Sequence, residues 1–222
     1  MNTYYKFPKI FHFDFSPNLQ NDDRVLPDIS AFHGKEIISS LKCDGECTTF
    51  YNDRIHARSV ESKDHESRHR VKQLWASVKY NIDPGWRICG ENLAAKHSIF
   101  YNNLPSYFLV FTIFNGENVC LNYNETKEFC ELLGLEMVPE IYRGIFDVEK
   151  IQSLFENYPN ILGGWEDENC SVPAHEGYVV RTTGSFHFND FQKNYAKFVR
   201  KGHVKSGNNW MYEKIIPNKL RR

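Results

Sequence analysis

Long apolar stretches, internal repeats and low-complexity segments are all absent from this sequence of 222 residues. No apolar run approaches the roughly 18 residues that a membrane-spanning helix requires. Residues 1–8 are polar and aromatic, and they contain no apolar core of a secretion signal. We therefore expect a protein that has no contact with a membrane and works in the cytoplasm.

Closely paired cysteines are lacking as well. None of the six cysteines forms a Cys-x-x-Cys pair, so a cysteine-based zinc site is not expected. Cys43 and Cys47 flank the segment that carries the suspected chemistry, which argues against a disulfide between them. We interpret the cysteines as reduced and buried, which is typical of a cytosolic protein.

A strong overall charge is also missing, since the formal net charge is −1 and shows no global signature of nucleic-acid binding. The distribution is uneven, however. Between Lys193 and Arg222 there are nine Lys or Arg residues and one acid, Glu213. A local charge near +8 attracts a polyanion through counterion release, although a solvated basic tail would have the same composition.

The composition is that of a folded chain, because 41% of the residues are apolar and 15% are aromatic. Hairpin signals outnumber βαβ spacings, which favours an α+β fold with largely antiparallel sheets and flanking helices. Asn124 or Thr126 is expected to cap the second helix, and Gly134 to end it. The patterns predict strands over residues 37–41, 86–93, 107–114, 178–182 and 195–199, a hairpin over 48–59, a loop over 61–70, and helices over 71–80, 124–133 and 148–158.

The most informative segment is Lys-Cys-Asp-Gly at residues 42–45, directly after the predicted strand 37–41. A lysine amine becomes nucleophilic once its pKa, about 10.4 in the reference state, is depressed by nearby cations or by burial. Lys197 and a bound metal are expected to supply that positive field. Gly45 permits a tight turn and a close approach of backbone N–H groups to phosphate. By itself, the tetrapeptide is more often a surface turn.

Further candidate residues lie at the ends or faces of predicted strands. Glu91 follows an apolar strand, and its carboxylate can accept hydrogen bonds from ribose hydroxyls. Glu176 lies just before a predicted strand, where a carboxylate can supply an oxygen ligand for Mg²⁺. Phe111 can stack on a purine. Lys197 and Arg200 are three residues apart and point to opposite faces of a regular strand, so we expect only Lys197 to face the site. Each residue alone has an ordinary structural explanation.

One other motif matches a known pattern. His-Glu-Ser-Arg-His at residues 65–69 fits the His-Glu-x-x-His pattern of zinc proteases, which requires both histidines on one face of a buried helix. Its flanking residues are almost all charged and leave little to bury such a helix. We therefore interpret residues 65–69 as part of a solvated loop.

Taken together, these segments resemble the covalent nucleotidyltransferase superfamily of DNA ligases, RNA ligases and mRNA-capping guanylyltransferases. The resemblance is closest to the RNA ligase family typified by bacteriophage T4 RNA ligase 2, and it runs from about residue 37 to residue 203. The matching segments are residues 42–45 for the nucleotide-accepting motif, 56–59 for the segment after it, 90–93 for the third motif, 108–113 for the adenine-stacking segment, 176–179 for the fourth motif and 196–200 for the fifth.

The resemblance implies a nucleotidyltransferase (ATP-grasp-like ligase) domain that uses ATP and Mg²⁺ or Mn²⁺. Lys42 would take AMP from ATP, pass it to an RNA 5′-phosphate, and a 3′-OH would then displace it to join the ends. The roles implied are catalysis for Lys42, Glu176 and Lys197; nucleotide binding for these three and for Asp44, Gly45, Arg58, Glu91 and Phe111; metal binding for Glu176; and RNA binding for Arg200, Lys201 and Lys205.

The sequence departs from the family pattern at two points. Leu41 precedes the lysine where the T4-like enzyme has an acidic residue. The fifth motif of that enzyme has two lysines separated by one residue, whereas Tyr195 and Lys197 stand at the matching positions here. The second cation of this motif is therefore unidentified, with Arg200 as one candidate.

We predict an N-terminal arm over residues 1–30, the nucleotidyltransferase domain over 31–205 and a basic C-terminal tail over 206–222. The tail is too short to form an OB-fold domain. We expect a monomer that acts on RNA ends or on a nicked duplex. Three alternatives stay open: a minimal ATP-dependent DNA ligase, a GTP-using capping guanylyltransferase, and an inactive module that binds RNA ends. Nucleotide choice and matched nicked RNA and DNA duplexes would separate them.

Overall fold

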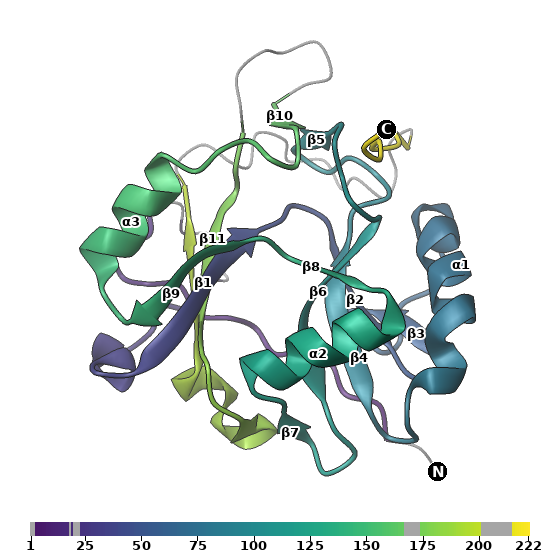
Figure 1. Cartoon of the computed structure of the whole chain (residues 1–222), viewed down its shortest axis with the longest axis horizontal. Coiled ribbons are helices and arrows are strands. Elements are labelled where there is room, and N and C mark those ends of the chain that lie inside the picture. The colour runs from purple at the N-terminus through teal and green to yellow at the C-terminus, as the bar shows by residue number, and fades with distance from the viewer. Residues whose placement is uncertain (1–2, 18, 20–22, 167–173, 201–214) are drawn as a thin grey trace.

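The computed structural model describes residues 3–17, 19, 23–166, 174–200 and 215–222 (Figure 1). It confirms an α+β fold with largely antiparallel sheets. The first sheet has four antiparallel strands in the order β13 (Tyr195–Val199), β11 (Gly177–Thr182), β1 (Glu36–Lys42) and β9 (Glu140–Ile145). β1 is therefore an inner strand of this sheet, with β11 on one side and β9 on the other.

The second sheet has seven strands among the described residues, and the predicted hairpin lies at one edge of it. Its order is β12 (Phe186–His187), β7 (Val119–Cys120), β6 (Phe108–Phe114), β4 (Arg87–Asn92), β2 (Glu46–Phe50) and β3 (Ile55–Ala57), with β8 (Glu136–Met137) paired in parallel to β6. A separate pair consists of β5 (Phe100–Tyr101) and β10 (Gly164–Trp165).

Within the described residues, the sheets are covered by the α-helices α1 (His69–Val78), α2 (Tyr123–Leu133) and α3 (Val148–Glu156) (Figure 1). α1 and α2 bury Val71, Val78 and Cys130 in the core of the second sheet, and α3 buries Ile151 and Phe155 in the core of the first. Burial of such apolar side chains is the main favourable contribution to the free energy of folding. Short 3-10 helices are η1 (Ile29–Phe32), η2 (Glu66–Arg68), η3 (Lys79–Asn81) and η4 (Phe188–Lys193).

The predicted elements agree with the structure, apart from two details. The loop expected over residues 61–70 contains η2 and the first two residues of α1. The predicted caps of α2 are wrong, because Asn122 is the N-cap. Its side chain accepts a hydrogen bond from the backbone N–H of Glu125, whose carboxylate accepts one in return from the N–H of Asn122. Gly134 ends the helix in the left-handed conformation, as predicted.

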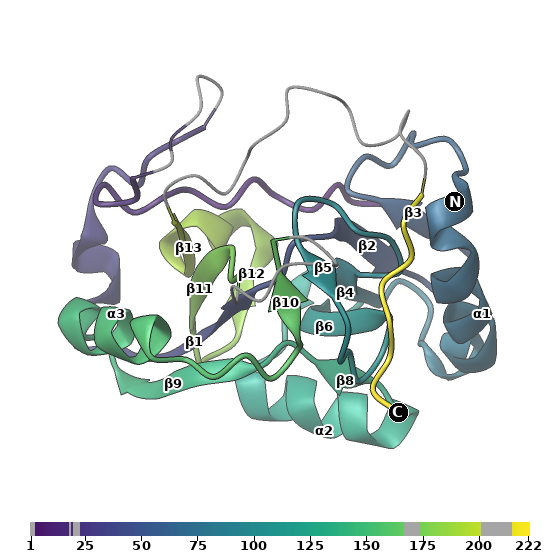
Figure 2. The same cartoon turned by 90° about the horizontal axis from the view of Figure 1, so that it is seen from above.

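Both ends of the described chain lie against the domain (Figure 2). In the N-terminal arm, the N–H of Phe13 donates to the carbonyl of Lys197, and the N–H of Lys197 donates to the carbonyl of Phe11. The arm therefore runs along the edge strand β13. At the other end, residues 215–222 form isolated bridges to Ala95 and Leu104. The predicted boundary at residue 206 lies outside the described residues.

In the part of the chain that the structure describes, no helix is both long and apolar enough to cross a bilayer.

Candidate active site

The segment that carries Lys42 connects the two sheets. β1 of the first sheet ends at Lys42, and β2 of the second sheet begins at Glu46. The connection is only three residues long, and a side chain at Gly45 would overlap the carbonyl oxygen of Asn92. Glycine is therefore required here for close approach of the loop to β4. The lysine lies at the junction between the sheets as a consequence.

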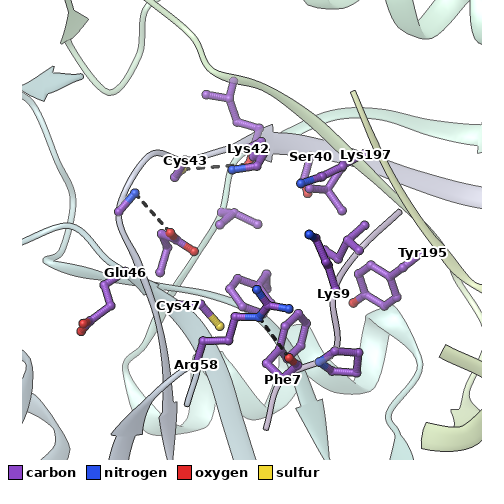
Figure 3. A pocket seen from close by; sticks show the side chains of 18 of the residues that line it. Phe7, Lys9, Ser40, Lys42, Cys43, Glu46, Cys47, Arg58, Tyr195 and Lys197 are labelled. Atoms are coloured by element: carbon purple, nitrogen blue, oxygen red, sulfur yellow. Dashed lines mark hydrogen bonds between the residues drawn. The ribbon is translucent and has the colours of Figure 1, made fainter. Parts of the chain in front are cut away.

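A cavity of about 460 Å³ lies between the sheets and is shown in Figure 3. The N-terminal arm forms part of its wall through Phe7, Pro8, Lys9, Ile10 and Asp23, which the sequence did not single out. These residues lack any recognisable motif, so no sequence signal could have found them. Of the predicted site residues, six line the cavity: Lys42, Gly45, Arg58, Glu91, Phe111 and Lys197.

Lys42 and Glu176 form a hydrogen-bonded ion pair. The pair is a product of strand register, because Lys42 lies opposite Gly177 at the start of β11. A side chain at Gly177 would overlap the carbonyl oxygen of Phe198 on β13, so glycine is needed for these strands to meet. The N–H of Arg200 donates to the carbonyl of Glu176 at 3.0 Å, which fixes the backbone that presents this carboxylate.

The expected depression of the Lys42 pKa is wrong for this structure. Burial alone would lower the pKa of Lys42, but the carboxylates of Glu176, Glu91 and Asp44 raise it, and the net direction is upward. The positive field instead acts on Lys197, whose pKa is lowered by burial and then by Lys42. The amine of Lys42 is therefore a protonated ammonium at neutral pH in this arrangement.

Glu91 and Asp44 hold the loop that follows Lys42. Glu91 accepts a hydrogen bond from the N–H of Gly45 at 3.1 Å. Burial raises its pKa to about 8, an effect that Lys42 opposes and that Glu176 and Asp44 strengthen. Asp44 accepts hydrogen bonds from the N–H groups of residues 98 and 99, at 2.6 and 2.7 Å. Asp44 thus has a positioning role, and its contact with a nucleotide stays a prediction.

Phe111 is the one residue of β6 that is not fully buried. Its ring packs edge-on against Phe7 of the arm, with the centroids 5.0 Å apart. Arg58 follows β3, and its Nε donates to the carbonyl of Phe7 at 3.3 Å. An aromatic face and a guanidinium therefore meet on the arm side of the cavity.

Of the three residues predicted to bind RNA, the structure describes Arg200. The guanidinium of Arg200 donates to the carbonyl of His175 and forms an ion pair with Glu166 at 3.7 Å. In this structure Arg200 supports the segment before Glu176, and its contact with RNA stays a prediction. Lys201 and Lys205 lie outside the described residues.

The side chains that could bind Mg²⁺ in this site are carboxylates. The described part of the chain contains no cluster of three or more His, Cys, Asp or Glu side chains that could hold a metal ion alone. Glu91 and Glu176 both act on Lys42 electrostatically. One or two carboxylates completed by substrate phosphates is the usual donor set for Mg²⁺, and these residues fit it. His65 and His69 do not share a helix, since His65 precedes η2 and His69 begins α1.

Comparison with known proteins decides the family. The model of the RNA ligase family matches residues 35–199, which include β1, the 42–45 segment and both β11 and β13. The chain belongs to the RNA ligase family. Whether it belongs to the subfamily of T4 RNA ligase 2 stays a prediction. A search of curated protein sequences finds no significant match to this family member.

Solved structures share the fold of this RNA ligase family member at low sequence identity. A point mutant of Naegleria gruberi RNA ligase with ATP and Mn matches with a TM-score of 0.51 and 17% identity, over 89% of this chain and 58% of that chain. An archaeal ATP-dependent RNA ligase matches with a TM-score of 0.52 and 15% identity, over 89% of this chain and 48% of that chain. A candidate ATP-dependent DNA ligase from Aquifex aeolicus matches with a TM-score of 0.54 and 18% identity, over 89% of this chain and 50% of that chain. The chain thus spans about half the length of these proteins.

Proposed function

We propose that this protein is an ATP-dependent RNA ligase that joins 3′-OH and 5′-phosphate RNA ends through a lysyl-AMP intermediate on Lys42. One observation carries the proposal beyond family membership. Lys42 borders a cavity that also receives Arg58 and Lys197, and its amine is bonded to Glu176. Cations around a cavity of this size suit a nucleotide with its phosphates.

In the first step, the lone pair of Lys42 Nζ attacks the α-phosphorus of ATP. A P–N bond forms, the bond to the β-phosphate breaks, and pyrophosphate leaves. The lysine must first lose a proton, because its raised pKa makes it an ammonium. We assign Glu176 to receive this proton, since its carboxylate oxygen accepts the hydrogen bond from Nζ.

In the second step, an oxygen of an RNA 5′-phosphate attacks the same phosphorus, and the P–N bond to Lys42 breaks. In the third, a 3′-OH attacks the 5′-phosphorus of the activated RNA, a phosphodiester forms, and AMP leaves. All three steps are in-line displacements, so orientation and charge neutralisation account for most of the catalysis. A bound Mg²⁺ or Mn²⁺ would neutralise charge at the phosphates, with Glu176 among the residues that hold it.

The remaining residues bind substrate in this proposal. Glu91 would accept hydrogen bonds from the ribose, and Phe111 would stack on the adenine. Arg58 and Lys197 would contact phosphate, Asp44 and Gly45 would shape the loop at the nucleotide, and Arg200, Lys201 and Lys205 would contact RNA. We further propose that the protein is a cytoplasmic monomer whose partners are ATP and RNA ends. The unpaired thiols of Cys43, Cys47, Cys89, Cys120 and Cys130 suit a reducing compartment.

The test is covalent labelling. The chain is treated with pyrophosphate to remove any bound AMP, mixed with α-labelled ATP and Mg²⁺, denatured, and examined for label. We expect labelling by ATP that Lys42→Ala abolishes and that Lys35→Ala, a change of an exposed lysine, leaves intact. Label that persists in Lys42→Ala would disprove the assignment.

The same experiment separates the alternatives. Label from GTP in place of ATP would indicate a capping guanylyltransferase. Sealing of a nicked DNA duplex in preference to a matched RNA duplex would indicate a DNA ligase. Wild-type chain that takes no label, yet binds RNA ends, would indicate an inactive binding module.

A further inference from the structure

A carboxylate from the N-terminal arm lies between two lysines of the cavity. Asp23 Oδ1 is 3.8 Å from Lys9 Nζ and 3.8 Å from Lys197 Nζ, so one oxygen faces both ammonium groups. Its other oxygen is 3.2 Å from His12 Nε2. Burial lowers the pKa of His12, so at neutral pH the imidazole is uncharged and the two lysines carry the positive charge.

This pair of lysines faces the same cavity as Lys42 and Arg58. Figure 3 shows Lys9 and Lys197 reaching into the cavity from neighbouring segments, with Lys42 and Arg58 at its other edges. Lys9 contributes to the lowered pKa of Lys197, after burial and Lys42. Like charges this close in a partly buried site are unfavourable unless an anion lies between them.

The position of Lys9 is built into the fold. The arm is hydrogen-bonded along β13 on both sides of Lys197, through the backbone of Phe11 and Phe13. Phe7, two residues before Lys9, is buried against Phe111 and Phe191. Lys9 therefore lies between two anchored points of the arm.

Lys9 is also a candidate for the second cation of the fifth motif, which the sequence left unidentified. Tyr195, at the position where the T4-like enzyme has a lysine, is buried and stacks on Phe191 with centroids 4.5 Å apart. Its ring packs in a core cluster and also lines the cavity, where its phenol brings no charge. Arg200 pairs with Glu166. Besides Lys42, a further cation beside Lys197 is Lys9, which comes from a segment nearly the whole domain away in sequence.

We propose that Lys9 and Lys197 form a two-lysine phosphate site, in which the Asp23 carboxylate takes the place of a phosphoryl oxygen until a phosphate displaces it. The proposal rests on the proposed function, because it assigns the phosphate to a substrate of that reaction. Two substrates carry such a group: the β- and γ-phosphates of ATP, and the 5′-phosphate of RNA. Both present oxygens that two ammonium groups can hold together.

The first experiment measures binding of inorganic pyrophosphate to the AMP-free chain by titration calorimetry. We expect Lys9→Met to weaken binding about tenfold, because one charge-assisted contact is lost. Lys9→Arg should keep most of the affinity. Lys6→Met removes an exposed lysine of the same arm and should bind as wild type does. Asp23→Asn should bind more tightly, because the competing carboxylate is neutralised.

The second experiment separates the two sources of phosphate. Labelling by ATP is measured over a range of ATP concentrations, and transfer of AMP to 5′-phosphorylated RNA is measured from chain that is already labelled. A Lys9→Met defect in pyrophosphate binding and in the apparent KM for ATP assigns the site to ATP. If Lys9→Met has normal pyrophosphate binding and a normal apparent KM for ATP, but transfers AMP to RNA slowly, the site belongs to the RNA 5′-phosphate.

Other outcomes overturn the proposal. Lys9→Met that matches wild type in pyrophosphate binding, labelling and transfer would remove Lys9 from the site. Lys9→Arg that fails as badly as Lys9→Met, with a lowered melting temperature, would make Lys9 a structural residue. Asp23→Asn that neither tightens pyrophosphate binding nor speeds the transfer of AMP to RNA would refute the displacement of Asp23. If the wild-type chain takes no label from ATP, but Lys9→Met still weakens its binding of pyrophosphate, the ligase function is refuted and the phosphate site is retained.

Discussion

At the residue scale, the electrostatics around Lys42 are set by carboxylates. Glu176, Glu91 and Asp44 all raise the pKa of this lysine, and together they exceed the opposite effect of burial. The carboxylates also act on one another, since Glu176 and Asp44 help to raise the pKa of Glu91. A site with this balance binds cations readily, and ATP would bring to it both negative phosphates and the metal ions that accompany them.

The raised pKa of Glu91 predicts a pH-dependent stability. The carboxyl titrates near 4.5 in the unfolded chain and near 8 in the folded one, so between these values the folded state holds a proton that the unfolded state has lost. The free energy of unfolding therefore falls as the pH rises from about 4.5 to about 8, by roughly 4 kcal/mol from this group. Glu91→Gln should remove that decline.

The measurement is urea denaturation of wild type and variant at pH 5, 6.5, 8 and 9. Glu117→Gln, a change of an exposed acid, is the control and should follow the wild-type curve. The difference between wild type and Glu91→Gln should grow up to pH 8 and then level off. Parallel curves for the two proteins would contradict the raised pKa.

At the scale of elements, the site depends on how β11 meets its neighbours. Gly177 pairs with Lys42 on one side and with Val199 on the other, directly after Glu176. The close contact with Phe198 leaves no room for a side chain at this position. The register of three strands thereby determines where the Glu176 carboxylate lies.

Gly177→Ala is therefore expected to damage both stability and activity. The new methyl group would force β11 and β13 apart, at a cost of about 2 kcal/mol in the free energy of unfolding. The displaced carboxylate should slow labelling of Lys42 by about 10- to 100-fold. Gly184→Ala is the matched control, because nothing lies within 4 Å of the added atom. Wild-type labelling rates in Gly177→Ala would show that strand register does not position Glu176.

At the scale of the whole molecule, both ends of the described chain support the active-site loop. The N-terminal arm forms one wall of the cavity, and the segment 215–222 buttresses the other side through Asn218. The Asn218 side chain accepts a hydrogen bond from the N–H of Tyr101 and donates one to the carbonyl of Leu93, both at 2.9 Å. The hydroxyl of Tyr101 in turn accepts from the N–H of Asp44.

Asn218→Ala should consequently lower stability, although the residue lies only four positions from the end of the sequence. Asn218 is 1% exposed, so its removal leaves two buried backbone groups without partners and costs about 2 kcal/mol. Denaturation by urea checks the value. Arg222→Ala, on the same segment but exposed, should change the stability by less than about 0.5 kcal/mol. Equal stabilities for the two variants would mean that the segment is not part of the folded domain.

Much of the fold was predictable from local patterns. The strands 37–41, 107–114 and 195–199 and all three α-helices have apolar periodicities that burial on one face or both requires. The Asn122 cap was missed because three polar residues near the helix start can each serve as a cap, and only the backbone conformation distinguishes them. The 42–45 segment and the motifs after it were recognised by order and spacing, and these led to the family.

The sequence by itself determined the fold class, the family and six of the residues that line the cavity. The tertiary structure decided the charge state of Lys42, the anchoring roles of Asp44 and Arg200, and the arrival of Lys9 and Asp23 from the arm. The physical reason is that motifs record residue types along the chain, whereas a pKa depends on every charge within a few ångströms in space. Residues far apart in sequence share no pattern, so only the folded chain brings them together.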